Sequence, residues 1–203
     1  MREKIIFIFS LAAAAALWFL TFVIKPFNFW AMMSFNAAIL IFLTFLSKEK
    51  IIFKDDFNLK NAFIGFFSAL ILYGIFFIGR KAVLFIPGNE NMLSSVYEAG
   101  PETPRYAVAL LLFFPIGFAE EFFWRGFIQK KLYTAYPKIQ AVLIASAFYT
   151  AVHIPTANPI LIAASAVCGL YWGLLYAFAG SFFAVSLSHM IWDPIIFVFF
   201  QIR

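Results

Sequence analysis

The sequence predicts an all-α protein, a polytopic transmembrane helix bundle of about seven spans. Three observations lead to this fold class. Of the 203 residues, 64% are hydrophobic and 30 are Phe, whereas only 12% are charged, about half the charged share of a soluble domain. About 130 apolar residues, at ~20 per membrane-spanning helix, are enough for six or seven spans. Long apolar runs also recur along the whole chain. This composition excludes a soluble enzyme, a small disulfide-bonded protein and a disordered protein.

The apolar runs give the expected spans in order. The first follows a short charged N-terminus, and its ~20 apolar residues exceed the core of a signal peptide, so we expect it to be retained as a span. Short polar segments separate the later runs. No repeat or linker divides the chain, so we expect residues 1–203 to form one membrane domain. The predicted spans are residues 5–24, 27–46, 61–79, 106–128, 139–154, 159–179 and 181–200.

The connections carry most of the charge. Residues 47–60 are expected outside the membrane, and residues 80–105 form the longest predicted loop, with room for one short surface helix. The basic residues divide nine to five between the two sides, which favours a cytoplasmic N-terminus. We expect the protein in the cell (plasma or inner) membrane. The nine are Arg2, Lys4, Lys48, Lys50, Lys54, Lys60, Lys130, Lys131 and Lys138, and the five are Lys25, Arg80, Lys81, Arg105 and Arg203. The net charge of +5 is therefore no sign of nucleic-acid binding.

Small residues recur every fourth position along the sixth run. Ser165, Gly169, Gly173 and Ala177 form one stripe, and such stripes let helix backbones approach closely. We therefore expect this span at the centre of the bundle. The single Cys168 lies beside the stripe, where it is expected to pack; it excludes an intrachain disulfide and a cysteine zinc site.

Six ionisable residues fall inside the apolar runs, where burial in hydrocarbon costs ~2.5–3.5 kcal/mol each for Asp and Arg. Such groups are expected to face one another or a wet cavity. Prolines near them, at 115, 155 and 194, should bend or end their helices, which favours a polar cavity among the fourth, fifth and seventh spans. The six are Glu120, Glu121, Arg125, His153, His189 and Asp193.

Their spacing predicts pairs. Glu121 and Arg125 are four residues apart on one helix, which favours an internal salt bridge. Glu120 points ~100° away from Glu121, so the two carboxylates can serve different neighbours. His189 and Asp193 share an i,i+4 face, as do Tyr149 and His153, where Tyr149 is expected mainly to pack.

These motifs resemble the CPBP family of intramembrane proteases, which includes type II CAAX prenyl endopeptidases and the Abi bacteriocin-processing and immunity proteins. Glu120-Glu121-Phe-Phe-Trp-Arg125 fits the EExxxR signature. Tyr149-Thr-Ala-Val-His153 is similar to the second motif, with Tyr where Phe is usual, and His189-Met-Ile-Trp-Asp193 to the third, with Asp in place of the commoner Asn. The resemblance covers a core of about residues 106–195.

The resemblance implies glutamate-dependent peptide hydrolysis within the membrane. By that analogy Glu120 activates a water with help from His153, while His189 and residue 193 stabilise the oxyanion. An ionised Asp193 cannot donate a hydrogen bond, so we expect it to orient His189 or to be protonated itself. Glu121, Arg125 and Tyr149 take supporting roles, and no cofactor is implied. The expected partner is a membrane-embedded or lipidated protein or peptide.

Three alternatives remain at this point. Glu120, Glu121, His153 and His189 are a plausible zinc set, although no HExxH motif is present. The same residues suit a proton-coupled transporter or channel, although no inverted repeat is visible. A silent immunity protein that keeps only the fold is the third. The sequence does not distinguish a prenylated C-terminus, a bacteriocin leader or a sorting tag as substrate, and it leaves the oligomeric state open.

Overall fold

The computed structural model describes residues 2–49, 51, 56–85 and 88–202, and within them it is helical with no strand. Seven helical stretches are long and apolar enough to cross a bilayer, as the sequence predicts. The multi-pass membrane fold class is therefore confirmed. The stretches are Arg2–Ile24, Phe29–Ser47, Leu59–Leu84, Arg105–Leu132, Lys138–Thr156, Pro159–Ala179 and Phe182–Phe199.

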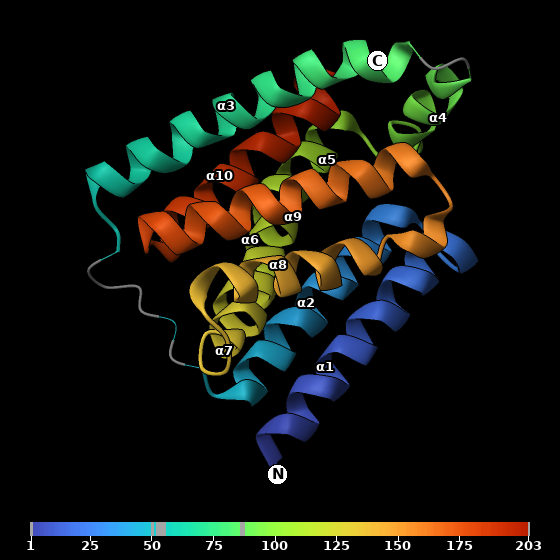
Figure 1. Ribbon diagram of the computed structural model, residues 1–203. Helices are drawn as coiled ribbons and strands as arrows, with labels where there is room; N and C mark the ends of the chain where they lie inside the picture. The colour runs from blue at the N-terminus through green and yellow to red at the C-terminus, as the bar shows by residue number, and fades with distance from the viewer. Residues whose placement is uncertain (1, 50, 52–55, 86–87, 203) are drawn as a thin grey trace.

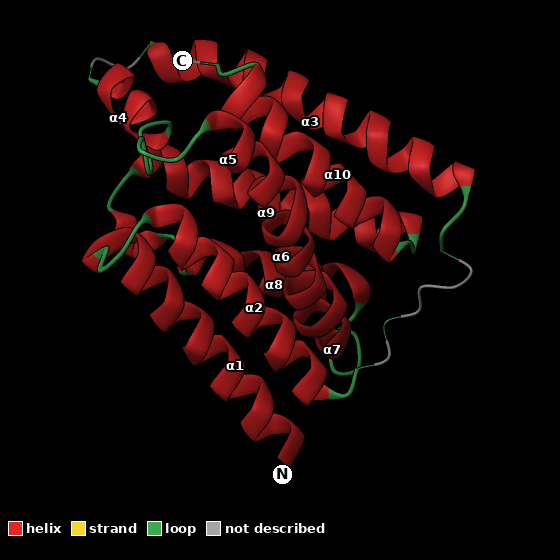
Figure 2. Ribbon diagram, turned by 180° about the vertical axis from the view of Figure 1, so that it is seen from behind, coloured by secondary structure: helices red, strands yellow, loops and turns green. Residues whose placement is uncertain are grey.

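The spans pack around the middle of the fourth one (Figure 1). There α6 (Gly117–Phe123) contacts α2 (Phe29–Ser47) on one side and α10 (Phe182–Pro194) on the other. The outer helices pair with these: α1 (Arg2–Phe19) lies beside α2, and α3 (Leu59–Leu84) lies along α10. The pair α8 (Lys138–Ala151) and α9 (Pro159–Ala179) packs across the remaining face, as the opposite view also shows (Figure 2).

Local residue chemistry sets the helix ends. The Asn28 side chain caps α2 by accepting hydrogen bonds from the Trp30 and Ala31 amides, and Asn158 caps α9 in the same way. Gly180 ends α9 with a φ of 64°, a left-handed conformation that glycine adopts without strain. These caps satisfy amide and carbonyl groups that would be costly to leave unpaired near hydrocarbon.

The fourth span is not a uniform helix. It runs as α5 (Arg105–Leu111), η2 (Leu112–Ile116), α6, η3 (Trp124–Gln129) and α7 (Lys130–Leu132), with π-helical turns in η2 and η3. Phe114, directly before Pro115, has an extended backbone (φ −155°, ψ 126°), so the helix bends where the proline predicts. Likewise α8 ends before Pro155, and α10 ends at Pro194, where the π-helical η5 (Ile195–Phe199) takes over.

One expectation about the connections needs correction. The third span continues to Leu84, so Arg80 and Lys81 lie on a helix rather than at the start of the loop. The loop that follows contains the predicted short helix, α4 (Asn89–Val96). Lys50, Lys54 and Arg203, which entered the orientation prediction, lie outside the described residues.

The small-residue stripe predicted that the sixth span lies at the bundle centre, and this prediction is wrong. Of its 18 most apolar consecutive residues 33% are buried, against 61% for the fourth and seventh spans. The stripe itself is buried, because it faces α8: a β-carbon on Gly169 would lie 3.4 Å from the Ser146 backbone, and one on Gly173 would lie 3.0 Å from Val142. Small residues therefore mark a close helix pair, which need not be central.

Candidate active site

Both glutamates of the EExxxR motif are buried on α6 and bind different neighbours, as their angular offset predicts. The Glu120 Oε2 atom accepts a hydrogen bond of 3.0 Å from the Tyr149 hydroxyl. The Glu121 Oε1 atom lies 2.8 Å from Arg125 Nη1 and 2.8 Å from His189 Nδ1. The predicted Glu121–Arg125 pair is therefore present, and it extends to the seventh span.

A glycine lets α6 approach α10 closely enough for this contact. A β-carbon on Gly117 would lie 3.3 Å from the Met190 α-carbon and 2.8 Å from the Leu112 carbonyl oxygen. Gly117 lies one turn before Glu121, and Met190 follows His189. The missing side chain thus brings the Glu121 carboxylate within hydrogen-bond distance of the imidazole.

His189 lies between two carboxylates. Its Nδ1 faces Glu121, and its Nε2 lies 3.3 Å from Asp193 Oδ2, a longer and weaker contact. The indole ring of Trp172 stacks on the imidazole, with centroids 3.7 Å apart and planes 18° apart. The ring is therefore held by Glu121 on one edge and by Trp172 on one face, while its Nε2 edge is held more loosely.

Arg125 ties this cluster to the sixth span. Its Nη2 atom donates to the Gly169 carbonyl oxygen at 2.9 Å, and its guanidinium lies 5.3 Å from the Tyr149 ring centroid and 5.7 Å from that of Trp172. The cation thus contacts a carboxylate, a carbonyl and two aromatic rings. Arg125 is only 2% exposed, so these contacts replace water around the charge.

His153 lies in a different, uncharged setting, one turn beyond Tyr149. Its Nδ1 is 2.8 Å from the Tyr149 carbonyl oxygen, and its Nε2 accepts a 3.1 Å hydrogen bond from the Trp18 indole N–H. Among the described residues no hydrogen bond joins His153 to Glu120. Tyr149 connects the two, because its hydroxyl donates to Glu120 and its carbonyl oxygen faces His153 Nδ1. Tyr149 therefore does more than pack.

A cavity of about 510 Å³ connects these groups, and Glu120, Tyr149, His153, His189 and Asp193 all line it. Its wall also includes residues of the first, second and sixth spans, so it is not confined to the fourth, fifth and seventh. Glu121 and Arg125 are absent from the lining and lie behind it. The exposed lining residues are Lys25, Ser95 and Glu98, all in or next to connections at the end of the bundle opposite the N-terminus.

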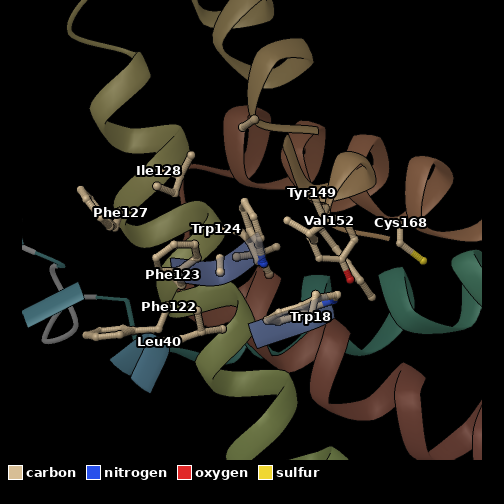
Figure 3. Packing of buried hydrophobic residues seen from close by; sticks show 14 of the residues in the cluster. Trp18, Leu40, Phe122, Phe123, Trp124, Phe127, Ile128, Tyr149, Val152 and Cys168 are labelled. Carbon is tan, nitrogen blue, oxygen red and sulfur yellow. The ribbon is translucent and has the colours of Figure 1, made fainter. Parts of the chain in front are cut away.

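Apolar side chains pack next to the glutamates of α6. Phe122 and Phe123 are 5% and 0% exposed and pack with Trp124 and Leu40 in the main core cluster (Figure 3). Trp124 also makes an edge-to-face contact with Trp18. This packing keeps bulk water away from the carboxylates except through the cavity.

The four candidate zinc ligands do not form one group. Glu121 contacts His189, Glu120 contacts Tyr149, and His153 is bound to Trp18. Across the part of the chain that the structure describes, no group of three or more His, Cys, Asp or Glu side chains is arranged to hold a metal ion.

Two tryptophans of the site were not among the residues that the sequence pattern predicted for it. Trp18 lies in the first span, far in sequence from the motifs, and Trp172 lies between the two glycines of the sixth span. A weak signal was available, because a buried indole N–H usually has an acceptor nearby. Which acceptor it has depends on the packing of the helices.

The chain has no significant match among curated proteins and none among solved structures. Residues 102–195, a little under half of the chain, match the model of one family, described as type II CAAX prenyl endopeptidase Rce1-like. All three motifs lie within this segment. The resemblance drawn from them is therefore confirmed, and residues 102–195 carry the signature of a membrane protease family of the CAAX endopeptidase type.

Proposed function

We propose that this protein is an intramembrane endopeptidase in which Glu120 activates the water that attacks a peptide bond. One observation supports this most strongly: Glu120 and His189, from different spans, line one cavity, and Glu120 makes no salt bridge with any residue that the structure describes. Its Oε2 accepts from the neutral Tyr149 hydroxyl, and its Oε1 makes no hydrogen bond among the described residues. A carboxylate so placed can take a proton from water.

The reaction follows from these positions. Water attacks the carbonyl carbon of the substrate while its proton passes to Glu120, and the carbonyl oxygen becomes an oxyanion. The carboxylic acid of Glu120 then protonates the departing nitrogen as the carbon–nitrogen bond breaks. Tyr149 holds the Glu120 carboxylate in place throughout.

His189 is the proposed donor to the oxyanion, through Nε2–H. Glu121 holds the opposite nitrogen, so Glu121 takes the orienting role expected of Asp193. The weak 3.3 Å contact of Nε2 with Asp193 can be exchanged for a substrate oxygen. A fixed donor in a site shielded from water typically contributes 10²–10³ to the rate.

The substrate that fits is a membrane-associated polypeptide with apolar residues near the cleaved bond. Phe22, Phe29, Met33 and Leu161 line the cavity together with the polar groups. A prenylated C-terminus, which the family name suggests, and a hydrophobic helix both suit such walls.

The test is a peptidase assay in proteoliposomes with two probes, a farnesylated CAAX peptide and a peptide fused to a transmembrane helix. Wild type should cleave at least one probe, and Glu120→Gln and His189→Ala should lose at least ~100-fold in rate. Glu3→Gln makes the same carboxylate-to-amide change on the surface and should cleave like wild type. Equal cleavage by all four proteins would refute the assignment and would favour a silent or transport function.

The zinc alternative is tested separately. We expect cleavage to survive a strong chelator and the purified protein to contain no stoichiometric metal. Loss of cleavage on chelation, with recovery on adding zinc, would make the enzyme a metalloprotease instead.

For orientation, we propose a cytoplasmic N-terminus in the cell membrane. Lys130, Lys131 and Lys138 lie at the same end as the N-terminus, and Lys131 Nζ is 2.7 Å from Glu3 Oε2. With this orientation the exposed lining of the cavity faces the extracytoplasmic side.

Cysteine labelling tests the orientation cleanly, because the native Cys168 is buried. In intact cells an impermeant maleimide should label Ser95→Cys, at the cavity mouth, and should label Thr134→Cys, at the N-terminal end, only after permeabilisation. The reverse pattern would place the N-terminus outside.

A further inference from the structure

The first span contributes a polar contact to the candidate site although it lies outside the family match. The Trp18 indole N–H donates to His153 Nε2 at 3.1 Å, and both groups are buried and line the cavity. The residues lie 135 positions apart in sequence. Figure 3 shows Trp18 in the same buried cluster as Tyr149 and Val152.

The two partners of His153 together specify one form of its ring. The Tyr149 carbonyl oxygen accepts only, so the Nδ1 atom that faces it at 2.8 Å must carry a hydrogen. An indole N–H donates only, so the Nε2 atom that faces Trp18 must be an unprotonated acceptor. His153 is thereby held as the neutral Nδ1–H tautomer.

Aromatic rings fix the orientation of the imidazole as well. The rings of Trp18, Phe22 and Tyr149 surround it at centroid distances of 6.0, 5.9 and 5.1 Å. Two of these three come from the first span. The first span therefore forms one wall of the His153 pocket and also supplies its only donor among the described residues.

We infer that Trp18 is a positioning residue for the proposed protease: it holds His153 as the neutral Nδ1–H tautomer, with the Nε2 lone pair fixed at the cavity wall. The inference rests on the proposed function for its catalytic meaning. With its Nε2 lone pair engaged by Trp18, His153 stays neutral and acts on the site through Tyr149, whose carbonyl it binds and whose hydroxyl holds Glu120. Without Trp18, Nε2 loses its donor and can take up a proton, while the Tyr149 carbonyl still holds Nδ1–H.

Nitrogen NMR measures the tautomer directly and needs no substrate. The chain has two histidines, so protein labelled with ¹⁵N in its imidazole rings gives two sets of signals, and His189→Gln identifies those of His153. Protonated and unprotonated ring nitrogens have well-separated ¹⁵N frequencies. Wild type should show His153 as a single Nδ1–H form with an unprotonated Nε2, and in Trp18→Phe the Nε2 signal should shift, because this nitrogen loses its donor and can take up a proton.

Trp124→Phe is the matched control. Trp124 is buried in the same cluster and contacts Trp18 edge to face, but its indole N–H has no hydrogen-bond partner among the described residues. Trp124→Phe should leave the His153 signals as in wild type. Unfolding temperatures of both variants show whether either has lost its fold.

Kinetics on a probe that wild type cleaves provide the second measurement. Trp18→Phe keeps the aromatic wall and removes one hydrogen bond, so we expect kcat to fall about five- to tenfold with little change in KM. An unchanged Nε2 signal in a folded Trp18→Phe variant would overturn the inference, whether or not proteolysis is found. A shifted Nε2 signal with unchanged kcat would overturn the catalytic role of Trp18.

Discussion

The two histidines of this protein lie on the same cavity but have opposite surroundings. His189 lies between the carboxylates of Glu121 and Asp193 and is covered by the Trp172 ring. His153 lies between a carbonyl and an indole N–H, both neutral. Imidazole is the same group in both places, so the partners decide its use: carboxylates favour a ring that donates at both nitrogens, whereas His153 must accept at one.

The largest expected effect is on stability and comes from removing the buried positive charge of Arg125, which pairs with Glu121 beside His189. Arg125→Leu leaves Glu121 buried without its cation, which should cost about 3–5 kcal/mol in the free energy of unfolding. Denaturant titration in mixed micelles measures it.

The surface pair of Lys131 and Glu3 serves as the control for that measurement. Glu3 is 75% exposed, so Glu3→Gln should change stability little. A loss after Arg125→Leu no larger than that after Glu3→Gln would mean that the buried cation does not balance Glu121.

Exchanging each histidine for Gln should separate their roles. His189→Gln should lower kcat by about 10²–10³, because an amide cannot donate to Glu121 and to the oxyanion from opposite sides as the imidazole does. His153→Gln should lower it by about tenfold, since His153 does not contact Glu120. Single-turnover rates of both variants on one cleaved probe measure the two effects. A larger fall in rate after His153→Gln than after His189→Gln would contradict the proposed roles and make His153 the main proton acceptor.

Tyr149 contacts both Glu120 and His153, so Tyr149→Phe tests whether these two contacts act independently. The change removes the 3.0 Å hydrogen bond to Glu120 but keeps the carbonyl that holds His153. We expect kcat to fall about five- to tenfold while the ¹⁵N signals of His153 stay close to wild type. A changed His153 tautomer would show that the hydroxyl and the carbonyl do not act independently.

The smallest effect is expected at Asp193. An amide in its place still accepts from His189 Nε2, and the existing contact is weak at 3.3 Å. Asp193→Asn should therefore keep kcat within about threefold of wild type, measured in the same assay. A loss as large as that of His189→Gln would show that the charge of Asp193 is required.

The sequence predicted much of the site because charges in a membrane are few and must be satisfied. It predicted the Glu121–Arg125 pair from i,i+4 spacing and the nearness of His189 and Asp193 from the same rule. It did not predict that Glu121 rather than Asp193 makes the shorter contact with His189. That contact depends on how closely α6 approaches α10 at Gly117, which spacing along one helix does not reveal.

The position of the small-residue stripe makes the same point. Its four members are buried, as the pattern predicts, but its two glycines lie against α8 rather than at the centre of the bundle. A periodic stripe identifies the face of a helix that packs closely. It carries no information about which neighbour fills that face.

The sequence alone predicts that this protein lies in a lipid bilayer, how many spans it has and which few polar groups must meet inside them. These follow from composition and from spacing along single helices, because burying charge in hydrocarbon is costly wherever it occurs. Only the tertiary structure decided which group meets which: Glu121 with His189, Glu120 with Tyr149, and His153 with Trp18. Hydrogen bonds require heavy atoms within about 3 Å, and only the packing of spans distant in sequence sets distances that short.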